Sequence, residues 1–348
     1  MLRWGILGPG SIARVFCNGL RFTDSGQAVA VASRDRARAE ALAGPFGIPN
    51  VYDSYDALLA DPDVDAVYVA NIHPAHLEWV VKAAEAGKHI LVEKPIGLNR
   101  PEAAQMIAAA EQHDVFLMEA FMYRCHPQIA RTTELIASGA IGQVRLIRSA
   151  FGYNAGSNYD GRALNQSLGG GGILDVGCYP ISAARWLAGA AQGQPFADPT
   201  SFKAHGVLAP TGVDHYTAAT MAFPGDIIAE VSTAVGCNIP GEVTVFGSEG
   251  TLSIDNPWLP SSPCRSAREP LPPETTFPAA TIQLTRGGNR ETITVPADRD
   301  LFTYEADMVA NHIAARQAPA MSWADTLGNM GALDQWRAEI GVRYAQDG

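Results

Sequence analysis

Glu93-Lys94-Pro95 is the first of two short segments whose side chains are suited to catalysis. It follows an apolar run typical of a buried strand, so Lys94 is expected at the carboxyl end of a parallel sheet, where ligands of such sheets bind. A lysine there can donate a hydrogen bond to a developing alkoxide and help to move a proton. The alternative is an ordinary surface lysine after a strand.

Asp175 and Tyr179 form the second segment, which follows the glycine run Gly169 to Gly172. On a helix, residues four apart share one face, so the two side chains would address a common ligand. The glycines indicate either a close approach of the backbone to a neighbour or a loop with unusual dihedral angles. Pro180 is expected to disturb the helix near Val176. A buried tyrosine beside a capping aspartate is the alternative interpretation.

A glycine-rich turn, Gly8-Pro9-Gly10-Ser11-Ile12-Ala13, follows the first predicted strand and opens the first predicted helix. In that context the pattern is typical of pyrophosphate binding, because backbone must approach the phosphates without a Cβ atom and the helix N-terminus supplies free amides. A tight turn between strand and helix is the alternative. The residues expected to contact the cofactor are Gly8, Gly10, Ser11 and Ile12.

The end of the second predicted strand should distinguish NADP from NAD. A carboxylate there binds the ribose 2′-hydroxyl group of NAD, whereas a nearby arginine accommodates the 2′-phosphate of NADP. Here the strand runs into Ser33 and Arg34, and Arg38 lies one helical turn further along. A guanidinium group can clamp a phosphate with its planar fork, so the sequence favours NADP. Asp35 keeps NAD possible, and a solvated Arg34 in the first helical turn is the alternative.

Residues 1–124 have the pattern of the parallel sheet that these side chains require. Short apolar runs alternate with helical periodicity, which is the signature of a doubly wound α/β fold. We therefore predict an N-terminal Rossmann dinucleotide-binding domain of five strands and four crossovers. The predicted strands are Leu2–Leu7, Gln27–Ser33, Ala66–Ala70, His89–Val92 and Val115–Met118. The predicted helices are Ser11–Phe22, Asp35–Ala43, Ala75–Ala86 and Arg100–Gln112.

Residues 125–348 are predicted to form a second, α+β domain with a large open, mainly antiparallel sheet. Strand-like segments separated by Gly, Pro and Asp turns carry this prediction. The segment 257–278 is rich in proline and serine and is expected to be a long surface loop. The predicted strands include Val144–Phe151, Ile227–Val235, Glu242–Phe246, Ile282–Thr285 and Glu291–Val295. The predicted helices are Pro127–Ser138, a stretch from Gly169 to Leu187, and the closing pair Leu301–Arg316 and Ala324–Ala345, which could pack back on the first domain.

Composition and charge exclude several classes of function. The formal net charge of −11 argues against nucleic acid as a partner, because such proteins usually present a basic face. The sequence shows no secretory leader pattern and no apolar run of membrane-spanning length, so we expect a cytoplasmic protein without a membrane partner. The cysteines are odd in number and widely spaced without a CxxC pair, so we expect no metal site and buried small hydrophobic residues. They are Cys17, Cys125, Cys178, Cys237 and Cys264.

Several ordered motifs together resemble the glucose-fructose oxidoreductase and inositol dehydrogenase (Gfo/Idh/MocA) family over nearly the whole chain. Within it, the chain is most similar to the branch of dimeric dihydrodiol dehydrogenases and NADP-dependent D-xylose 1-dehydrogenases. Inositol dehydrogenases of the family carry histidine where this chain has Tyr179, so inositol is not the expected substrate. The motifs are Leu2-Arg3-Trp4-Gly5-Ile6-Leu7-Gly8-Pro9-Gly10, Asn71-Ile72-His73-Pro74-Ala75-His76, Ala86-Gly87-Lys88-His89, Glu93-Lys94-Pro95, Glu119-Ala120-Phe121-Met122-Tyr123-Arg124 and the segment from Asp175 to Pro180.

The resemblance implies roles for individual residues. Lys94 looks like the catalytic lysine, Tyr179 matches the tyrosine that acts as acid and base, and Asp175 matches the acidic residue of the substrate pocket. The loop that borders the nicotinamide, and the motif that carries the lysine, add four expected cofactor contacts: Asn71, His73, Glu93 and Lys94. Two arginines are expected either to contact substrate hydroxyl groups or to form structural ion pairs: Arg124 and Arg162.

The sequence thus predicts an NADP-dependent oxidoreductase that transfers hydride to or from a sugar or cyclic polyol. An aldose 1-dehydrogenase, acting on a D-xylose-like sugar, is the leading hypothesis. A trans-dihydrodiol dehydrogenase or a keto-sugar reductase would use the same site. A catalytically silent NADP-binding regulator is an alternative of another class, and redox-neutral use of a tightly held nicotinamide is a third. The resemblance also implies a homodimer or tetramer formed through the C-terminal sheet.

Overall fold

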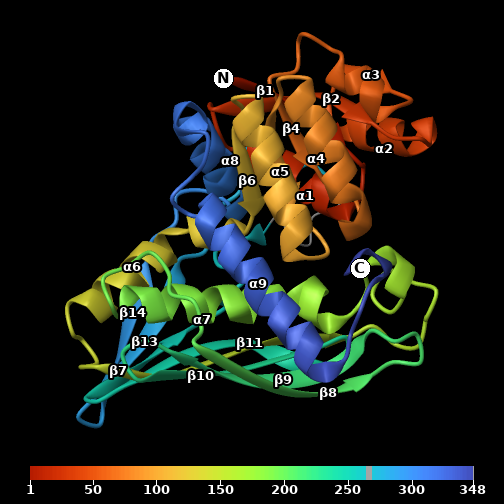
Figure 1. The fold of residues 1–348 in the computed structure, drawn as a ribbon. Helices are drawn as coiled ribbons and strands as arrows, with labels where there is room; N and C mark the ends of the chain where they lie inside the picture. The colour runs from red at the N-terminus through yellow and green to blue at the C-terminus, as the bar shows by residue number, and fades with distance from the viewer. Residues whose placement is uncertain (264–268, 348) are drawn as a thin grey trace.

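The computed structural model describes residues 1–263 and 269–347 and shows two domains, one stacked on the other (Figure 1). The first contains a six-stranded sheet of order β3-β2-β1-β4-β5-β6. The second contains an eight-stranded sheet of order β14-β13-β12-β11-β7-β10-β9-β8. The predicted fold class, a Rossmann domain followed by an α+β domain with a large and mainly antiparallel sheet, is confirmed.

Every strand pair of the first sheet is parallel. The strand order reverses between β1 and β4, and ligands of such sheets bind outside the strand ends at that switch point. The strands of this sheet are β1 (Leu2–Leu7), β2 (Gly26–Ala32), β3 (Asn50–Tyr52), β4 (Ala66–Val69), β5 (His89–Glu93) and β6 (Leu117–Ala120). The helices between them are α1 (Ser11–Leu20), α2 (Arg36–Phe46), α3 (Tyr55–Leu59), α4 (His76–Glu85) and α5 (Arg100–Gln112).

The prediction of five strands in this domain was wrong by one. It missed β3 and the short helix α3 that follows it. β3 has only three residues and lies at the edge of the sheet, where all three stay half-buried. A segment so short shows neither an apolar run nor an alternation, so the hydrophobic pattern carries no signal for it.

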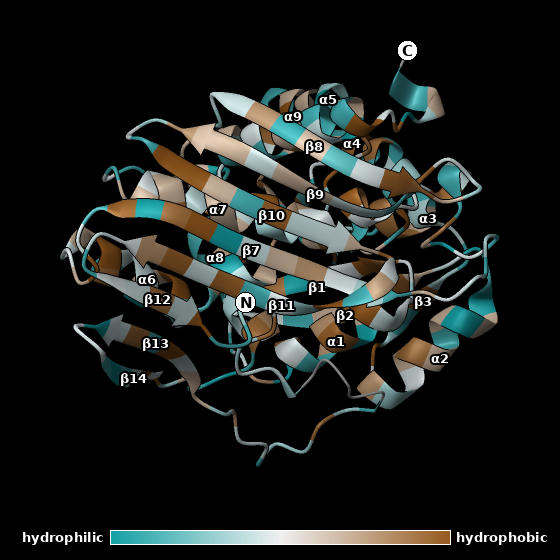
Figure 2. Cartoon of the chain, turned by 90° about the horizontal axis from the view of Figure 1, so that it is seen from below, coloured by the Kyte–Doolittle hydropathy of each residue, from teal (hydrophilic) through white to brown (hydrophobic). Residues whose placement is uncertain are grey.

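In the second sheet one strand pair departs from the antiparallel pattern, because β7 and β10 run parallel at its centre. Helix α7 (Cys178–Ala190) lies along one face of the sheet, and all of its residues are buried (Figure 1). The opposite face is turned toward the viewer in Figure 2. The strands are β7 (Val144–Asn154), β8 (Ser201–Leu208), β9 (Asp214–Phe223), β10 (Ile227–Ala234), β11 (Gly236–Gly247), β12 (Gly250–Ile254), β13 (Ala280–Arg286) and β14 (Asn289–Val295).

Three further helices lie in the second half of the described chain: α6 (Pro127–Ala137), α8 (Leu301–His312) and α9 (Trp323–Ile340). Helix α8 packs on α1 of the Rossmann domain, where Thr303 donates to the carbonyl of Gly19 at 2.7 Å. Helix α9 contacts α5 of the first domain and both α7 and β8 of the second. The C-terminal part of the chain therefore fixes the two domains against each other.

The cysteines are not all buried, contrary to the prediction. Cys17 and Cys178 are buried, Cys125 is half-buried and Cys237 is exposed on β11, while Cys264 lies outside the described residues. In the part of the chain that the structure describes, no group of three or more His, Cys, Asp or Glu side chains could hold a metal ion. No helix within those residues is long and apolar enough to cross a membrane.

Candidate active site

The glycine-rich turn after β1 has the geometry that a bound pyrophosphate needs. Gly8 adopts φ +98°, and a Cβ atom on it would meet Asn71 Oδ1 at 2.5 Å. Gly10 is the N-cap residue of α1 and has no side chain that could accept a hydrogen bond. The amides of the first turn, including those of Ser11 and Ile12, are therefore not capped by a side chain of this residue. A Cβ atom on Gly10 would meet nothing within 4 Å. The turn thus combines exposed helix amides with open space, which fits a phosphate group.

Among the residues after β2, Asp35 serves the fold, whereas Arg34 and Arg38 remain available to a ligand. Asp35 is the N-cap of α2, because its carboxylate accepts the amide of Ala37 at 3.1 Å. Ser33 is buried, and its hydroxyl accepts the amide of Asp35 at 3.2 Å. Arg34 and Arg38 are exposed and form no ion pair with any described residue. The acidic residue is therefore occupied, and the two guanidinium groups are free to meet a phosphate.

Asn71 and His73 lie in the loop after β4, next to the glycine-rich turn. Asn71 Oδ1 accepts the hydroxyl of Tyr55 at 3.0 Å, whereas its buried Nδ2 has no hydrogen-bond partner among the described residues. Such a donor is costly to bury unless a ligand or water completes it. The ring of His73 donates to the carbonyl of Gly169 at 3.1 Å, and burial lowers the pKa of His73 to about 3. His73 therefore joins the cofactor loop to the glycine run as a neutral side chain.

Lys94 stands directly after β5, as predicted from the sequence. The amide of Lys94 donates to the Glu93 carboxylate at 3.2 Å, and that carboxylate also accepts the hydroxyl of Tyr68. Lys94 Nζ crosses to the second domain and donates to the backbone carbonyl of Asp175 at 2.6 Å. It also lies 4.9 Å from the centre of the Tyr179 ring. The structure thus brings together the three residues that the sequence singled out for catalysis.

The Asp175 carboxylate is held by two side chains of the second domain. Tyr153 donates to Oδ2 at 2.5 Å and Arg162 donates to Oδ1 at 3.0 Å. Burial raises the pKa of Asp175, but the positive charges of Lys94 and Arg162 outweigh this effect, so its pKa lies well below the usual range. Asp175 is therefore an ionised hydrogen-bond acceptor at neutral pH, and Tyr153 is a site residue that sequence reasoning missed.

The helix that carries Asp175 and Tyr179 begins as a π-helical turn, Ile173–Gly177, and continues as α7. Pro180 lies in the first turn of α7 and has no amide hydrogen to donate back to Val176. The expected disturbance of the helix near Val176 therefore takes the form of a π turn, a feature frequent at functional sites.

Aromatic side chains surround Tyr179, whose hydroxyl donates to Met122 Sδ at 3.5 Å. One of them, Trp258, comes from the segment predicted as a surface loop, yet it is buried and donates to the carbonyl of Ala150 at 3.2 Å. A tryptophan inside a proline- and serine-rich loop was the available signal for this contact. The rings within 6 Å of Tyr179 belong to Phe121, Tyr123, Phe151 and Trp258.

The two arginines predicted near the substrate have different positions. Arg162 contacts Asp175 and is partly exposed, so it remains a candidate for substrate contact. Arg124 instead forms a buried ion pair with Asp325 of α9 at 3.0 Å and also donates to Ser182 at 3.2 Å. This is the structural ion pair that was the alternative for Arg124, and it ties the Rossmann domain to the closing helix.

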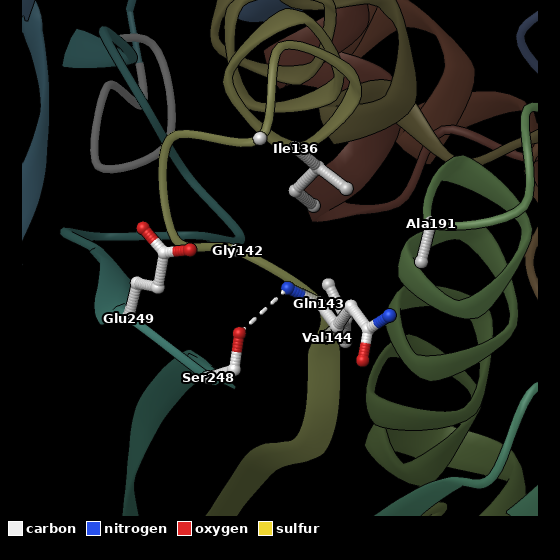
Figure 3. A pocket seen from close by; sticks show the side chains of 8 residues that line it. Ile136, Gly142, Gln143, Val144, Ala191, Ser248 and Glu249 are labelled. Atoms are coloured by element: carbon white, nitrogen blue, oxygen red, sulfur yellow. Dashed lines mark hydrogen bonds between the residues drawn. The ribbon is translucent and has the colours of Figure 1, made fainter.

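A separate pocket of about 530 Å³ lies at the far end of α7, next to Ala191 (Figure 3). The amide of Gln143 donates there to the Ser248 hydroxyl at 3.0 Å, and the carboxylate of Glu249 lies beside them. None of the predicted site residues lines this pocket. It is thus distinct from the site around Lys94.

Comparison with known proteins agrees with this geometry. Residues 2–121 match the family described as "Oxidoreductase family, NAD-binding Rossmann fold", and residues 129–253 match the "GFO/IDH/MocA C-terminal domain". The chain belongs to the Gfo/Idh/MocA family. As a member of this family it is an NAD(P)-dependent oxidoreductase that acts on CH–OH groups.

Among similar Gfo/Idh/MocA proteins are trans-1,2-dihydrobenzene-1,2-diol dehydrogenases. That of Danio rerio is 35% identical over 351 residues, and that of Mus musculus is 32% identical over 358 residues, each covering 99% of both chains. Among solved structures, a 3-ketoreductase from Actinomadura kijaniata in complex with NADP and TDP-benzene is 26% identical, with a TM-score of 0.82 over 97% of this chain and 98% of that one. An aldose-aldose oxidoreductase from Caulobacter crescentus shares the fold, with a TM-score of 0.83 over 97% of each chain at 24% identity.

Proposed function

We propose that this chain is an NADP-dependent dehydrogenase that oxidises a hydroxyl-bearing ring carbon, with an aldose oxidised at C1 as the leading substrate. The observation that carries the proposal is the meeting of Lys94 with the Asp175–Tyr179 segment across the domain boundary. When bound, the nicotinamide accepts or returns the hydride. The groups around Lys94 include hydrogen-bond donors and acceptors held by neighbouring side chains, which suits a substrate with several hydroxyl groups.

In this proposal the phenolate form of Tyr179, next to the positive charge of Lys94, takes the proton of the reacting hydroxyl group and becomes a neutral tyrosine, and Lys94 stabilises the negative charge that develops on the substrate oxygen. Asp175 orients the substrate by accepting from a neighbouring hydroxyl group, while Arg162 and Tyr153 keep the carboxylate in place. Tyr179 is buried, so bulk water competes poorly with the substrate for proton exchange at its oxygen. In the reverse direction the same groups would protonate the oxygen of a ketone or lactone.

The preference for NADP rests on the residues after β2. Asp35 uses its carboxylate to cap α2, and this argues against a ribose contact of the kind that selects NAD. Arg34 and Arg38, with the buried hydroxyl of Ser33, supply the donors that a 2′-phosphate needs. Glycine residues and open space at Gly10 suit the pyrophosphate.

A trans-dihydrodiol is the second candidate substrate, for two reasons. The aromatic side chains around Tyr179 can pack against an unsaturated six-membered ring. Several full-length relatives are dihydrodiol dehydrogenases by name. A keto-sugar reductase is the same chemistry in the opposite direction.

Absorbance of reduced nicotinamide tests the proposal, with NADP and NAD each offered against pentoses, hexoses, inositols and a trans-dihydrodiol. We expect turnover with NADP and an aldose. Turnover with the dihydrodiol alone would favour the second candidate. Silence across the panel would contradict the proposal: binding of NADPH would then indicate a regulator, and cofactor retained through purification would indicate redox-neutral chemistry.

The outer face of the second sheet is our proposed contact between subunits of a homo-oligomer. Figure 2 shows this face of the sheet. Tyr216 on β9 is 44% exposed, and Ile228 on β10 is 51% exposed two residues before Glu230, which forms an ion pair with Arg148. Large apolar side chains exposed on one side of a flat sheet are typical of a subunit interface. Light scattering of the purified chain should give a dimer or tetramer, and Ile228→Arg should shift it toward the monomer.

A further inference from the structure

The glycine run before Asp175 is confined by close neighbours from both domains. Gly169 and Gly171 adopt φ +71° and +111°. A Cβ atom on Gly170 would meet the backbone oxygens of the loop 162–165 at 2.8 to 2.9 Å. A Cβ atom on Gly172 would meet Asp214 Oδ2 at 2.9 Å. The glycines are therefore required by close neighbours, so the positions of those neighbours determine the path of the run.

Asp214 begins β9 and is fully buried against the start of the π-helical turn. Its Oδ2 atom accepts the amide of Ile173 at 2.8 Å, and the amide of Gly172 also donates to this carboxylate. Its Oδ1 atom has no partner within the described residues and occupies the place that a side chain on Gly171 would need. Burial raises the pKa of Asp214 to about 7, so this side chain is only partly ionised at neutral pH, and it stabilises the helix end as a hydrogen-bond acceptor for free amides. Asp214 thus caps the helix that carries Asp175 from outside that helix.

Tyr344 approaches the same run from the C-terminal segment after α9. Its buried hydroxyl donates to the carbonyl of Gly170. The segment around it is tied to both domains, because Asn99, which caps α5, donates to the carbonyl of Gln346 at 3.1 Å, and Gln166 donates to the carbonyl of Arg343 at 2.8 Å. Asn99 lies five residues after Lys94. The C-terminal segment therefore connects the loop that follows the lysine with the glycine run.

We propose that Asp214 and Tyr344 are positioning residues for the reaction, an inference that rests on the function proposed above. They hold the glycine run so that the π-helical turn presents Asp175 and Tyr179 at the distance from Lys94 seen in the structure. In this proposal neither side chain contacts the substrate or the cofactor. The effect of each is exerted through the backbone of residues 170–173.

The test compares Tyr344→Phe, Asp214→Ala and Asp214→Asn with the wild-type chain. The phenylalanine and alanine variants should lose on the order of 10- to 100-fold in kcat, since a displacement near 1 Å at a reacting group has effects of that size. The dissociation constant of NADPH should stay within about twofold, because none of the substituted residues belongs to the cofactor loops. Asp214→Asn, which retains an acceptor oxygen for the amides, should recover most of kcat. Amide hydrogen exchange in residues 171–175 should become faster in Tyr344→Phe.

Tyr304→Phe is the matched control, because it removes a tyrosine hydroxyl whose bond to Asp298, at 2.7 Å, lies away from the site. Its kcat should equal that of the wild type. The proposal is overturned if Tyr344→Phe keeps wild-type kcat and wild-type exchange in residues 171–175, or if its loss only follows the unfolded fraction. Should Asp214→Ala fail to fold, Tyr344→Phe decides. A wild-type chain silent on every substrate would contradict the proposed function, and the exchange measurement alone would then decide the positioning role.

Discussion

Arg34→Ala tests the assignment of NADP without disturbing the fold. Arg34 is exposed and forms no ion pair with the described residues, so its removal leaves no charge unpaired. A hydrogen bond to a charged group contributes about 1.5 to 3 kcal/mol, and each 1.4 kcal/mol is tenfold in affinity. We therefore expect NADP binding to weaken by about 10- to 150-fold and NAD binding to stay unchanged. The thermal midpoint should not move.

Arg36→Ala is the matched control, because Arg36 is an exposed arginine two residues after Arg34, at the start of α2, that already pairs with Glu40 and Asp53. Titration of each variant with NADPH and NADH, followed by fluorescence or calorimetry, gives the two dissociation constants. Added salt should reduce the difference between Arg34→Ala and the wild type, since exposed charges are screened. An unchanged ratio of NADPH to NADH affinity in Arg34→Ala would refute the assignment of the 2′-phosphate to this arginine.

Three further outcomes are expected. Gly10→Ala should keep wild-type stability, because the added Cβ atom meets no protein atom within 4 Å. Calorimetry should nevertheless show weaker binding of both NADPH and NADH. Unchanged binding of both cofactors would contradict the pyrophosphate site. Asp175→Asn should lower kcat/KM by about 10- to 150-fold with NADPH affinity preserved, and an equal loss of cofactor binding would point to a collapsed site instead. His126 caps α6 through Nδ1, and burial lowers its pKa from 6.5 to about 4. The neutral form of His126 therefore contributes to the free energy of unfolding above pH 6.5, and this contribution, at most about 3 kcal/mol, is lost as the pH falls toward 4. In urea unfolding, His126→Asn should lose less of its free energy of unfolding over that pH range than the wild type.

The fold was predictable where a pattern spans many residues. The glycine turn and the repeated alternation of apolar runs with helical segments predict the Rossmann domain. The edge strand β3 was not predicted, because its three half-buried residues are too few to show a hydrophobic period. The parallel pairing of β7 with β10 was not predicted, because the relative direction of two paired strands depends on which strands become neighbours in the sheet. The local sequence pattern does not encode which strands become neighbours.

The candidate site was predictable where the reactive residues belong to sequence motifs. Lys94, Asp175 and Tyr179 meet as expected, although they come from two domains. Tyr153 and Trp258 were missed because each reaches the site from a segment without a motif, and only the tertiary fold places it there. For Arg124 a motif was present, but its partner Asp325 lies 201 residues away in the chain, so the sequence left its role open.

The most direct test of the account is kcat/KM for NADP-linked oxidation of the best substrate, measured for the wild type, Lys94→Ala and Tyr179→Phe. The surface variants Lys82→Ala and Tyr304→Phe serve as controls, since Lys82 pairs with Asp56 and Glu78 on the outside of α4. We expect a loss of about 10²- to 10⁴-fold in both site variants with NADPH binding retained, and wild-type rates in both controls. Substantial turnover by Tyr179→Phe or by Lys94→Ala would contradict the claim that these two residues carry the chemistry.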